Sequence, residues 1–407
     1  MVGLSGMALA VISDKAQDVF RAFLEISPYS GLFVTPVGFG LVVWMTNRYF
    51  PGTQGSGIPQ AIAARQLKSP RDRVKLVGLR SAVGKLLMTT AGLAVGASTG
   101  REGPTVQIGA AIMFLTGRIS PRRQQGLILA GSAAGIAGAF NTPLAGIVFA
   151  IEEMSRSFEM RTSGLIIGTV ILAGMVPLTV FGNYIYFGTT HDVLHFGWGW
   201  LAVPVIGVIG GICGGAFSRV LLLVTLGCPG RIGRFIKARP VAFAVICGMV
   251  VALCGLATGG AVNGTGYEAA REALHGRSEL SFIYAPLKFL ATVASAISGL
   301  PGGIFSPSLS VGAGLGADLS LLFPNVPIGV IVLLGMVAYF TGVVQAPITA
   351  FVIVMEMTDN NHMLLPLMAC ALIANAASKV MCKEGVYQAQ ARIFVKWVES
   401  TSTRPVR

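Results

Sequence analysis

Three short glycine-rich segments contain residues that can bind an anion. They read GSGIP at 55–59, GREGP at 100–104 and GGIFSP at 302–307. Each has a proline where a helix could begin, a position that tolerates the missing N–H group of proline. The start of a helix carries unpaired N–H donors and about half a positive charge. The backbone of each segment can therefore help to bind an anion.

Each segment also has a plainer interpretation, in which glycine and proline merely end one helix and begin another. Taken alone, each segment favours that interpretation. Several helix starts that converge on one point would instead hold a monovalent anion without a full cationic partner. A weak hold suits an ion that must also leave its site. An anion pathway is therefore a hypothesis that depends on the three segments meeting in space.

The surrounding sequence is typical of a polytopic membrane protein. Of the 407 residues, 53% are hydrophobic and 12% are charged, and the mean hydropathy is +0.72. A soluble domain usually carries about 25% charged residues. A spanning helix needs roughly 20 apolar residues whose backbone bonds are satisfied internally, so we expect each long uncharged run to be helical. These runs are 124–151, 162–190, 240–267, 289–317 and 319–355.

Glycine and proline interrupt the apolar runs. The chain has 53 glycines and 20 prolines, and the stretch 131–146 reads GSAAGIAGAFNTPLAG. Small residues let helices pack closely in a membrane. Helices that break near the midplane are typical of transporters. We therefore expect an all-α fold of short, broken or tilted helices.

The same motifs recur in the two halves of the chain. GREGPTVQIG at 100–109 and GIFSPSLSVG at 303–312 share the form G-x-x-x-P-x-x-x-x-G, displaced by 203 positions. Farther along, TPLAGIVFAIEEM at 142–154 matches APITAFVIVMEM at 346–357, so that Glu152 corresponds to Glu356. Ordered echoes at a nearly constant displacement predict an internal duplication.

We expect the duplication to divide the chain into a first half at 1–227, a basic connector at 228–240 and a second half at 241–407. The echo itself does not show whether the halves are inverted. In transporters such halves are often inverted, and the substrate often binds where they meet.

Basic residues outnumber acidic ones, and the formal net charge is +13. They gather in connectors at 65–80 and 231–239 and in the tail at 392–407, which makes nucleic acid a poor partner. The positive-inside rule places such connectors in the cytoplasm, and charge that only solubilises loops is equally compatible. We expect both termini to be cytoplasmic. The first 20 residues lack the basic start of a signal peptide and are expected to form a membrane helix.

Cysteine and histidine give no metal or catalytic pattern. The six cysteines have no CxxC spacing and the four histidines form no HExxH pair. The apolar segments show no nucleophile and base in a catalytic pattern. We therefore expect no cofactor, no metal and no enzymatic activity.

The glycine-rich segments and their flanking motifs occur in the order found in one transporter family. GSGIP, GREGP followed by TVQIG, and GGIFSP are joined by NTPLAGIVFAIEEM, QAPIT and MEMTDN. In these motifs, over nearly the whole chain, the sequence resembles the CLC family of chloride channels and proton-coupled chloride transporters. The resemblance implies roughly 17 helices and a homodimer with one pathway in each subunit. The apolar stretches near 171–181, 199–225, 330–337 and 366–378 are candidates for the dimer face.

The resemblance implies a central chloride site. Ser56 matches a hydroxyl donor, which gives one neutral hydrogen bond and favours chloride over nitrate. Tyr387, in EGVYQAQA, matches a tyrosine near the end of the family's last helix whose phenol donates to the anion. A purely structural tyrosine is the alternative. Backbone groups complete the expected anion site at Gly57, Ile58, Gly103, Ile304 and Phe305.

The resemblance assigns two acids to proton transport. An acid in a membrane segment is usually functional. Glu102, in GREGP, would occupy an anion position as a carboxylate and leave that position when it is protonated. The alternative is an acid that only complements a helix dipole. Glu153, in AIEEM, matches the inner proton-transfer glutamate of the exchangers. Its alternative is a surface acid paired with Arg156 and Arg161, whereas Glu152 is expected to be structural.

Two cations are expected to give electrostatic support. Lys85 is isolated in VGKLLMTTAGLAVGA, where it is either a buried charge that attracts the anion or a lysine that snorkels from a helix end. Arg101 stands beside Glu102.

The predicted function is chloride/proton exchange in a bacterial inner membrane, and the alternative is a passive voltage- or pH-gated chloride channel of the same fold. The expected partners are chloride, protons, lipid and a second copy of the chain. Gln60, Ile62 and Gln66 depart from the acids that many exchangers carry after GSGIP. The chain ends 20 residues after Tyr387, so we expect no regulatory CBS pair.

Overall fold

The computed structural model describes residues 1–117, 123–155, 160–182, 185–277 and 280–402, with the side chains of 160–163, 180 and 181 left aside. Arg156, the side chain of Arg161 and the last part of the basic tail, 403–407, lie outside this description.

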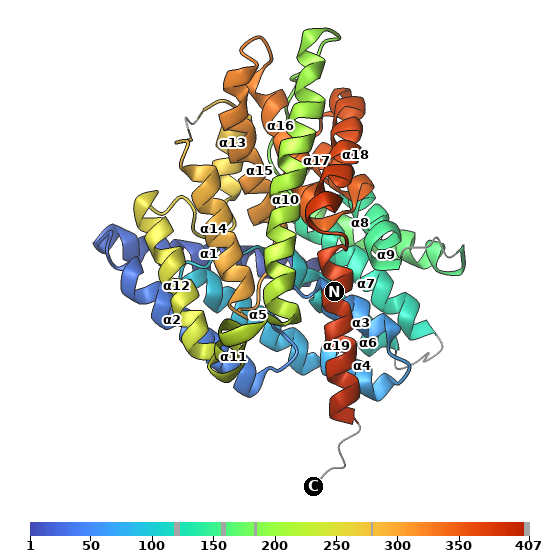
Figure 1. Ribbon diagram of the computed structural model, residues 1–407. Coiled ribbons are helices and arrows are strands. Elements are labelled where there is room, and N and C mark those ends of the chain that lie inside the picture. The colour runs from blue at the N-terminus through green and yellow to red at the C-terminus, as the bar shows by residue number, and fades with distance from the viewer. Residues whose placement is uncertain (118–122, 156–159, 183–184, 278–279, 403–407) are drawn as a thin grey trace.

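The described chain is built from α-helices, which confirms the predicted fold class (Figure 1). The described residues form nineteen α-helices, close to the expected number of roughly 17. They are α1 (Val2–Ile26), α2 (Gly31–Tyr49), α3 (Ile58–Gln66), α4 (Pro70–Val77), α5 (Leu79–Ala94), α6 (Glu102–Thr116), α7 (Gln124–Phe140), α8 (Pro143–Phe149), α9 (Met160–Phe181), α10 (Ala202–Gly227), α11 (Gly230–Ala238), α12 (Pro240–Ala257), α13 (Tyr267–Leu274), α14 (Tyr284–Ile297), α15 (Phe305–Leu319), α16 (Ile328–Val344), α17 (Pro347–Thr358), α18 (Leu364–Met381) and α19 (Val386–Ser402).

Most of the uncharged runs are divided between two or more helices, as expected for broken helices. Run 124–151 ends α7 at Asn141, which is left-handed at φ 57°, and restarts α8 at Pro143. In run 319–355, α16 ends at Gln345, also left-handed at φ 58°, and α17 restarts at Pro347. A left-handed residue ends a helix and the nearby proline begins the next one. Of the helices searched in the described chain, three are long and apolar enough to cross a membrane, namely Trp198–Gly227, Pro240–Ala257 and Asn361–Met381.

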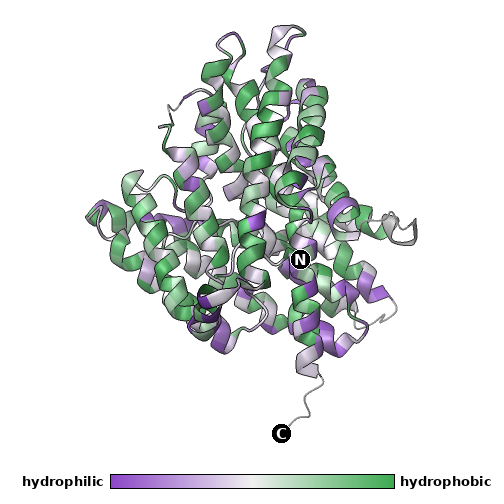
Figure 2. Ribbon diagram, viewed as in Figure 1, coloured by the Kyte–Doolittle hydropathy of each residue, from purple (hydrophilic) through white to green (hydrophobic). Residues whose placement is uncertain are grey.

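The outer helices present apolar side chains to their surroundings, as a lipid environment requires. Figure 2 shows hydrophobic residues over most of the outer helices, whereas many hydrophilic ones gather toward the lower end, where the chain terminates. Exposed apolar residues include Phe33 on α2 at 75%, Leu172 on α9 at 68% and Leu365 on α18 at 67%.

The interior is organised around α16, whose residues from Val330 to Phe340 have no exposed surface. Helices α10, α15 and α18 pack against it. Residues 330–337 therefore cannot form a dimer face, because they are covered within one subunit. The expectation of a dimer face at 330–337 was wrong. Burial inside a membrane protein and exposure to lipid select the same apolar residue types, so the sequence does not distinguish them.

Two duplicated glutamates make reciprocal contacts between the repeats. The carboxylate of Glu356 accepts hydrogen bonds from the N–H groups of Leu144 and Ala145 at 3.0 and 2.8 Å, at the start of α8. In the same way Glu152 accepts hydrogen bonds from Ile348 and Thr349 at 3.1 and 2.6 Å, at the start of α17. Each glutamate satisfies orphan N–H groups of the other repeat. Mutual contacts of this kind arise when two halves are related by an approximate twofold axis.

The order of the elements also bears on the limits of the repeat. A helix of 25 residues, α1, is followed by one of 19, α2, and later a helix of 26, α10, is followed by one of 18, α12. Helices α6 and α15 both have 15 residues, and α7 and α16 both have 17. Helix α10 packs against α16 and α18, and both of these helices belong to the second half of the chain. This arrangement favours a repeat boundary before α10 over the predicted connector at 228–240, which holds the short helix α11.

Candidate anion pathway

The three glycine-rich segments converge. The N–H of Gly100 donates to the carbonyl of Gly303 at 2.8 Å, and the N–H of Gly303 donates to the carbonyl of Gly100 at 2.7 Å. Gly55 pairs with the segment around Pro301, where the N–H of Gly302 donates to the carbonyl of Gly55 at 3.0 Å. These bonds bring the starts of α3, α6 and α15 together. Positions 100 and 303 are equivalent in the repeat, so the two halves meet at this point.

Glycine permits this close approach at two positions. Gly57 has φ 109°, a left-handed conformation that favours glycine, and a Cβ there would lie 2.6 Å from the carbonyl oxygen of Gly103. A Cβ at Gly103 would lie 2.7 Å from the carbonyl oxygen of Ser56. The starts of α3 and α6 can touch only because neither residue has a side chain.

Two hydroxyl groups point into the region where the helix starts meet. Ser56 is 5% exposed and Tyr387 is fully buried. Neither hydroxyl makes a well-formed hydrogen bond within the described residues, although the two lie close enough to interact. The ring of Phe305 stacks on that of Tyr387 with centroids 6.1 Å apart. Buried hydroxyl groups usually have a partner, so this pair is suited to an anion that accepts hydrogen bonds from both.

The position of Tyr387 corrects one detail. It is the second residue of α19 and therefore stands at the start of the last helix, not near its end. The start of a helix brings its N–H groups toward the same region as the phenol.

Main-chain N–H groups face the same region. Ile58 and Phe305 are the first residues of α3 and α15, and Ile304 caps α15. Ile58, Ile304 and Phe305 are buried, at 5% exposure or less. The first N–H groups of a helix have no intrahelical partner, so these groups are of the kind that can bind an anion.

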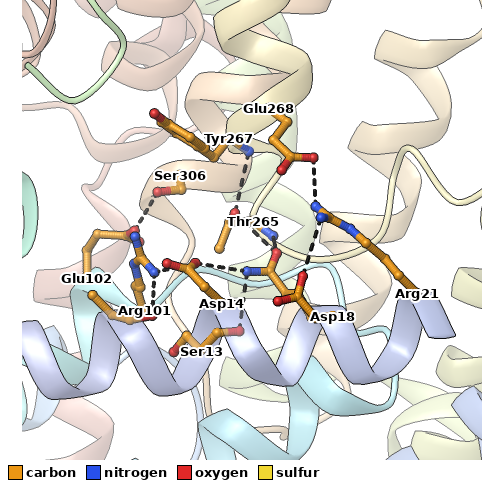
Figure 3. A network of polar contacts seen from close by, with 12 residues as sticks. Ser13, Asp14, Asp18, Arg21, Arg101, Glu102, Thr265, Tyr267, Glu268 and Ser306 are labelled. Atoms are coloured by element: carbon orange, nitrogen blue, oxygen red, sulfur yellow. Dashed lines mark hydrogen bonds and ion pairs between the residues drawn. The ribbon is translucent and has the colours of Figure 1, made fainter.

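Glu102 lies at the joined starts of α6 and α15 (Figure 3). Its side chain is fully buried, and Ser306 Oγ donates to Glu102 Oε1 at 2.5 Å. The carboxylate also lies within reach of the N–H groups of Glu102 and Ser306. It therefore occupies the kind of position that an anion would take between two helix N-termini.

The side chain of Arg101, the neighbour of Glu102, is bound to α1. Its guanidinium donates to the carbonyl of Ala10 at 2.8 Å and to Asp14 Oδ1 at 2.6 Å (Figure 3). The Arg101 side chain is 11% exposed and Asp14 is 60% exposed. Arg101 is thus close enough to Glu102 for an electrostatic interaction, but its direct partner is Asp14. Sequence reasoning missed Asp14 and Ser306, and only the position of Ser306 in GGIFSP gave a signal.

Lys85 does not snorkel, so that alternative was wrong. It has no exposed surface, and its Nζ donates to the carbonyls of Thr53 at 2.6 Å and Gly55 at 2.7 Å. Lys288, 203 positions later, is also fully buried and donates to the carbonyls of Val262 at 2.9 Å and Gly264 at 3.0 Å. Lys85 therefore holds the loop that leads to Ser56, and Lys288 does the same for the related loop before α13.

Glu153 lies inside the protein, at 4% exposure, which excludes a surface acid. It belongs to a π-helical turn at Ala150–Ser155, a local widening that is frequent at functional sites. The carbonyl of Glu153 accepts a hydrogen bond from Gln388 Nε2 at 2.6 Å, and its carboxylate is within electrostatic range of Tyr387. Gln388 and Tyr387 are neighbours on α19, so this helix joins the inner acid to the central hydroxyl pair.

The family described as voltage gated chloride channel has a sequence model that matches residues 38–379. This chain belongs to the CLC family. It is 30% identical to the H(+)/Cl(-) exchange transporter ClcA of Yersinia pseudotuberculosis, over 99% of this chain and 87% of that protein. It is 29% identical to ClcA of Yersinia pestis, over 99% and 88% of the two chains.

Solved structures resemble this CLC protein over nearly its whole length. A slow cyanobacterial Cl-/H+ antiporter superposes with a TM-score of 0.84 at 25% identity, covering 98% of this chain and 96% of that one. A CLC-type fluoride/proton antiporter gives a TM-score of 0.79 at 23% identity, over 96% and 95%, and shows the fold alone. The chain is an integral membrane protein of this fold.

Gln60, one of the expected departures from acids in the stretch after GSGIP, stabilises the backbone of the preceding loop. Its Nε2 donates to the carbonyls of Gly52 at 3.2 Å and Gln54 at 2.6 Å. A carboxylate has no hydrogen to donate, so glutamate could not make these bonds. Gln60 and Lys85 thus stabilise the same loop before Ser56 from two sides.

A cluster of aromatic rings extends from the central hydroxyl pair toward Glu102. Neighbouring rings have centroids 4.6–6.2 Å apart, mostly in edge or tilted arrangements. Sequence reasoning missed this cluster because its members lie in separate segments. They are Phe140, Phe149, Tyr186, Phe187, Tyr267, Phe305, Phe340 and Tyr387.

Proposed function

We propose that this CLC protein exchanges chloride for protons, with Glu102 as both gate and proton carrier. The main support for this proposal is the buried Glu102 carboxylate, which lies at the joined starts of α6 and α15 and accepts a hydrogen bond from Ser306. Relatives that align over nearly the whole chain are named as H(+)/Cl(-) exchange transporters, and the slow cyanobacterial Cl-/H+ antiporter superposes on it.

Competition for one position links the two ions. As a carboxylate, Glu102 fills the place between the two helix starts and excludes chloride. A proton removes its charge and with it most of the attraction to the helix dipoles, so the side chain can leave. Chloride then enters, and its arrival keeps the acid away until the anion moves on. Proton and chloride steps therefore alternate at the same site.

Farther along the pathway, chloride would rest between Ser56 and Tyr387. Two hydroxyl donors and the first N–H groups of α3 and α15 can solvate it. The nearby cations are occupied, because Lys85 binds two carbonyls and Arg101 binds Asp14. A site made of dipoles holds a monovalent anion weakly enough for release.

Glu153 would pass protons between the inner solution and Glu102. Its burial and its position beside α19, near Tyr387, support this role. We place the protein in a bacterial inner membrane as a homodimer with both termini in the cytoplasm. Its ions would be chloride and protons, and no cofactor takes part.

Flux through liposomes that hold the purified protein tests this function. An outward chloride gradient should drive protons uphill, measured as internal pH without an ionophore. Glu153→Gln should abolish proton movement and preserve chloride flux. Glu102→Gln should abolish proton movement and make chloride flux independent of pH. Glu268→Gln, which neutralises an acid with 63% side-chain exposure, is the matched control.

Chloride flux without proton movement in the parent protein would indicate a passive channel and contradict exchange. Proton movement that survives Glu153→Gln would remove that residue from the pathway. Absence of anion flux from intact dimers would contradict anion transport itself.

A further inference from the structure

Tyr186 is a buried tyrosine in the segment that joins α9 to α10. Its ring packs on Phe140, Phe187 and Tyr267, with centroids 5.4, 5.1 and 4.8 Å away. The residue is 4% exposed, and its hydroxyl makes no well-formed hydrogen bond within the described residues. A buried hydroxyl without a partner is costly, so its position calls for a physical reason.

The Tyr186 hydroxyl lies beside the group that holds Glu102. It is close enough to interact with the side chain of Ser306 and with the charges of Glu102 and Arg101. The ring of Phe305, the neighbour of Ser306, packs on the ring of Phe140 with centroids 6.2 Å apart, and the Phe140 ring packs in turn on the Tyr186 ring. Tyr186 therefore reaches the start of α15 from the side of the aromatic cluster.

Proton counting sets the direction of a bond between these hydroxyls. A serine hydroxyl has one hydrogen, and Ser306 donates it to Glu102 Oε1 at 2.5 Å. Ser306 can then only accept from Tyr186. In the chain that this direction allows, Tyr186 donates to Ser306 and Ser306 donates to the carboxylate. Such chains strengthen each member through polarisation.

We propose that Tyr186 is a positioning residue that retains the ionised Glu102 side chain at the start of α15 by donating through Ser306. The inference rests on the proposed gating by Glu102 and adds a determinant of the pH at which the gate leaves. Protonated Glu102 gains little from the chain, because a neutral acid is a poorer acceptor than a carboxylate.

The main chain holds Tyr186 in place for this task. The hydroxyl of Tyr267 donates to the carbonyl of Tyr186 at 2.6 Å. The N–H groups of Phe187 and Thr190 donate to the carbonyls of Met357 and Thr358 at 2.9 and 3.1 Å, at the end of α17. The segment is thereby anchored to α13 and α17, which fixes the backbone that carries the Tyr186 ring, while Phe140, Phe187 and Tyr267 pack against the ring itself.

Other titratable groups around Glu102 are engaged elsewhere or more distant. Arg101 of α6 pairs with Asp14 of α1, and Tyr267 of α13 donates to the Tyr186 carbonyl. Tyr387 of α19 interacts with Ser56 and is the group that Glu153 faces. Of the groups named here, Tyr186 alone has a free hydroxyl beside Ser306 within the described chain.

The test is the pH dependence of chloride flux in liposomes for Tyr186→Phe, which removes one oxygen atom. Loss of the donor should let the gate leave at higher pH. We expect the midpoint to move upward by roughly half to one pH unit, with flux at alkaline pH about three to ten times that of the parent. Tyr339→Phe is the matched control, because Tyr339 is also fully buried with an unpaired hydroxyl but lies near Cys213 and Phe289.

A midpoint unchanged in Tyr186→Phe, with pH dependence lost in Glu102→Gln, would overturn this inference and leave the proposed function standing. Parent-like pH dependence in Glu102→Gln would overturn both. In the double variant, Tyr186→Phe should add nothing to Glu102→Gln. If Tyr186→Phe does not fold, a ring-fluorinated tyrosine at position 186 keeps the hydroxyl and makes it a stronger donor. It should move the midpoint downward, and an unchanged or upward midpoint would contradict the inference.

Discussion

At the scale of single residues, the pathway depends on side chains that serve the backbone. Lys85 and Lys288 each bind two carbonyl oxygens of a glycine-rich loop and have no exposed surface. A buried ammonium group is tolerated when it is well hydrogen-bonded. Here the positive charge replaces water as the partner of carbonyls that point away from helix starts, which leaves the N–H groups of those starts for the anion.

The two lysines should differ in function and agree in stability. Lys85→Met and Lys288→Met each leave two buried carbonyls without a donor, so each should lower the free energy of unfolding by about 2–3 kcal/mol, measured as thermal unfolding in detergent. Only Lys85→Met should also weaken chloride binding, measured by calorimetry, because only its loop carries Ser56. Equal loss of chloride affinity in both variants would show that the long-range charge of the lysines contributes more to chloride binding than the position of the loop before Ser56.

At the scale of elements, the helix starts are held together by bonds between the repeats. Gly100 and Gly303 exchange two hydrogen bonds, and Glu152 and Glu356 each bind the start of a helix in the other half. The carboxylates bind unpaired N–H groups and also complement the helix dipoles. The expected structural role of Glu152 agrees with these contacts, which explain why Glu152 recurs as Glu356 while Glu153 does not recur.

The reciprocal contacts predict a symmetric effect of substitution. Glu152→Gln and Glu356→Gln should each reduce stability by about 1 kcal/mol, because an amide has one acceptor oxygen where a carboxylate has two and carries no charge for the dipole. Thermal unfolding of both single variants and of the double variant would measure this. A large effect of one substitution beside none for the other would contradict equivalent roles. Exposed Glu268→Gln serves as the control.

At the scale of the whole molecule, the arrangement of the connectors predicts an orientation in the membrane. Helix α10 runs from the upper end of the molecule downward, and α11 and the end of α19 lie toward the lower end (Figure 1). Basic residues occur in α11 and α19, so the positive-inside rule predicts that this end is cytoplasmic. Phe196, which precedes α10 and is 95% exposed, then faces outward.

Cysteine labelling in sealed vesicles would test this orientation. Ile232→Cys on α11 and Lys396→Cys on α19 should react with an impermeant maleimide only from the cytoplasmic side. Phe196→Cys should react only from the other side. The parent protein, with its six cysteines, provides the background. Labelling of positions 232 and 396 from opposite sides would contradict the orientation.

The sequence by itself determined the solvent, the fold class and the main members of the site. Low charge and long apolar runs require a bilayer. The repeated G-x-x-x-P motifs predict helix starts from the local sequence alone. Gly57 and Gly103 could be named from these motifs, whereas the close approach that excludes a side chain at either position is a property of the structure.

Only the tertiary structure decided which groups are free to act. Sequence cannot distinguish a lysine that faces an anion from one that binds carbonyls, and Lys85 does the latter. Nor can it separate the buried stretch 330–337 from a lipid-facing one, because both are apolar. Ser306 and Asp14 join the surroundings of Glu102 through contacts that span 204 and 87 positions of sequence, and Tyr186 joins them through aromatic packing. Such contacts depend on how distant helices pack, a property that no local pattern of residues encodes.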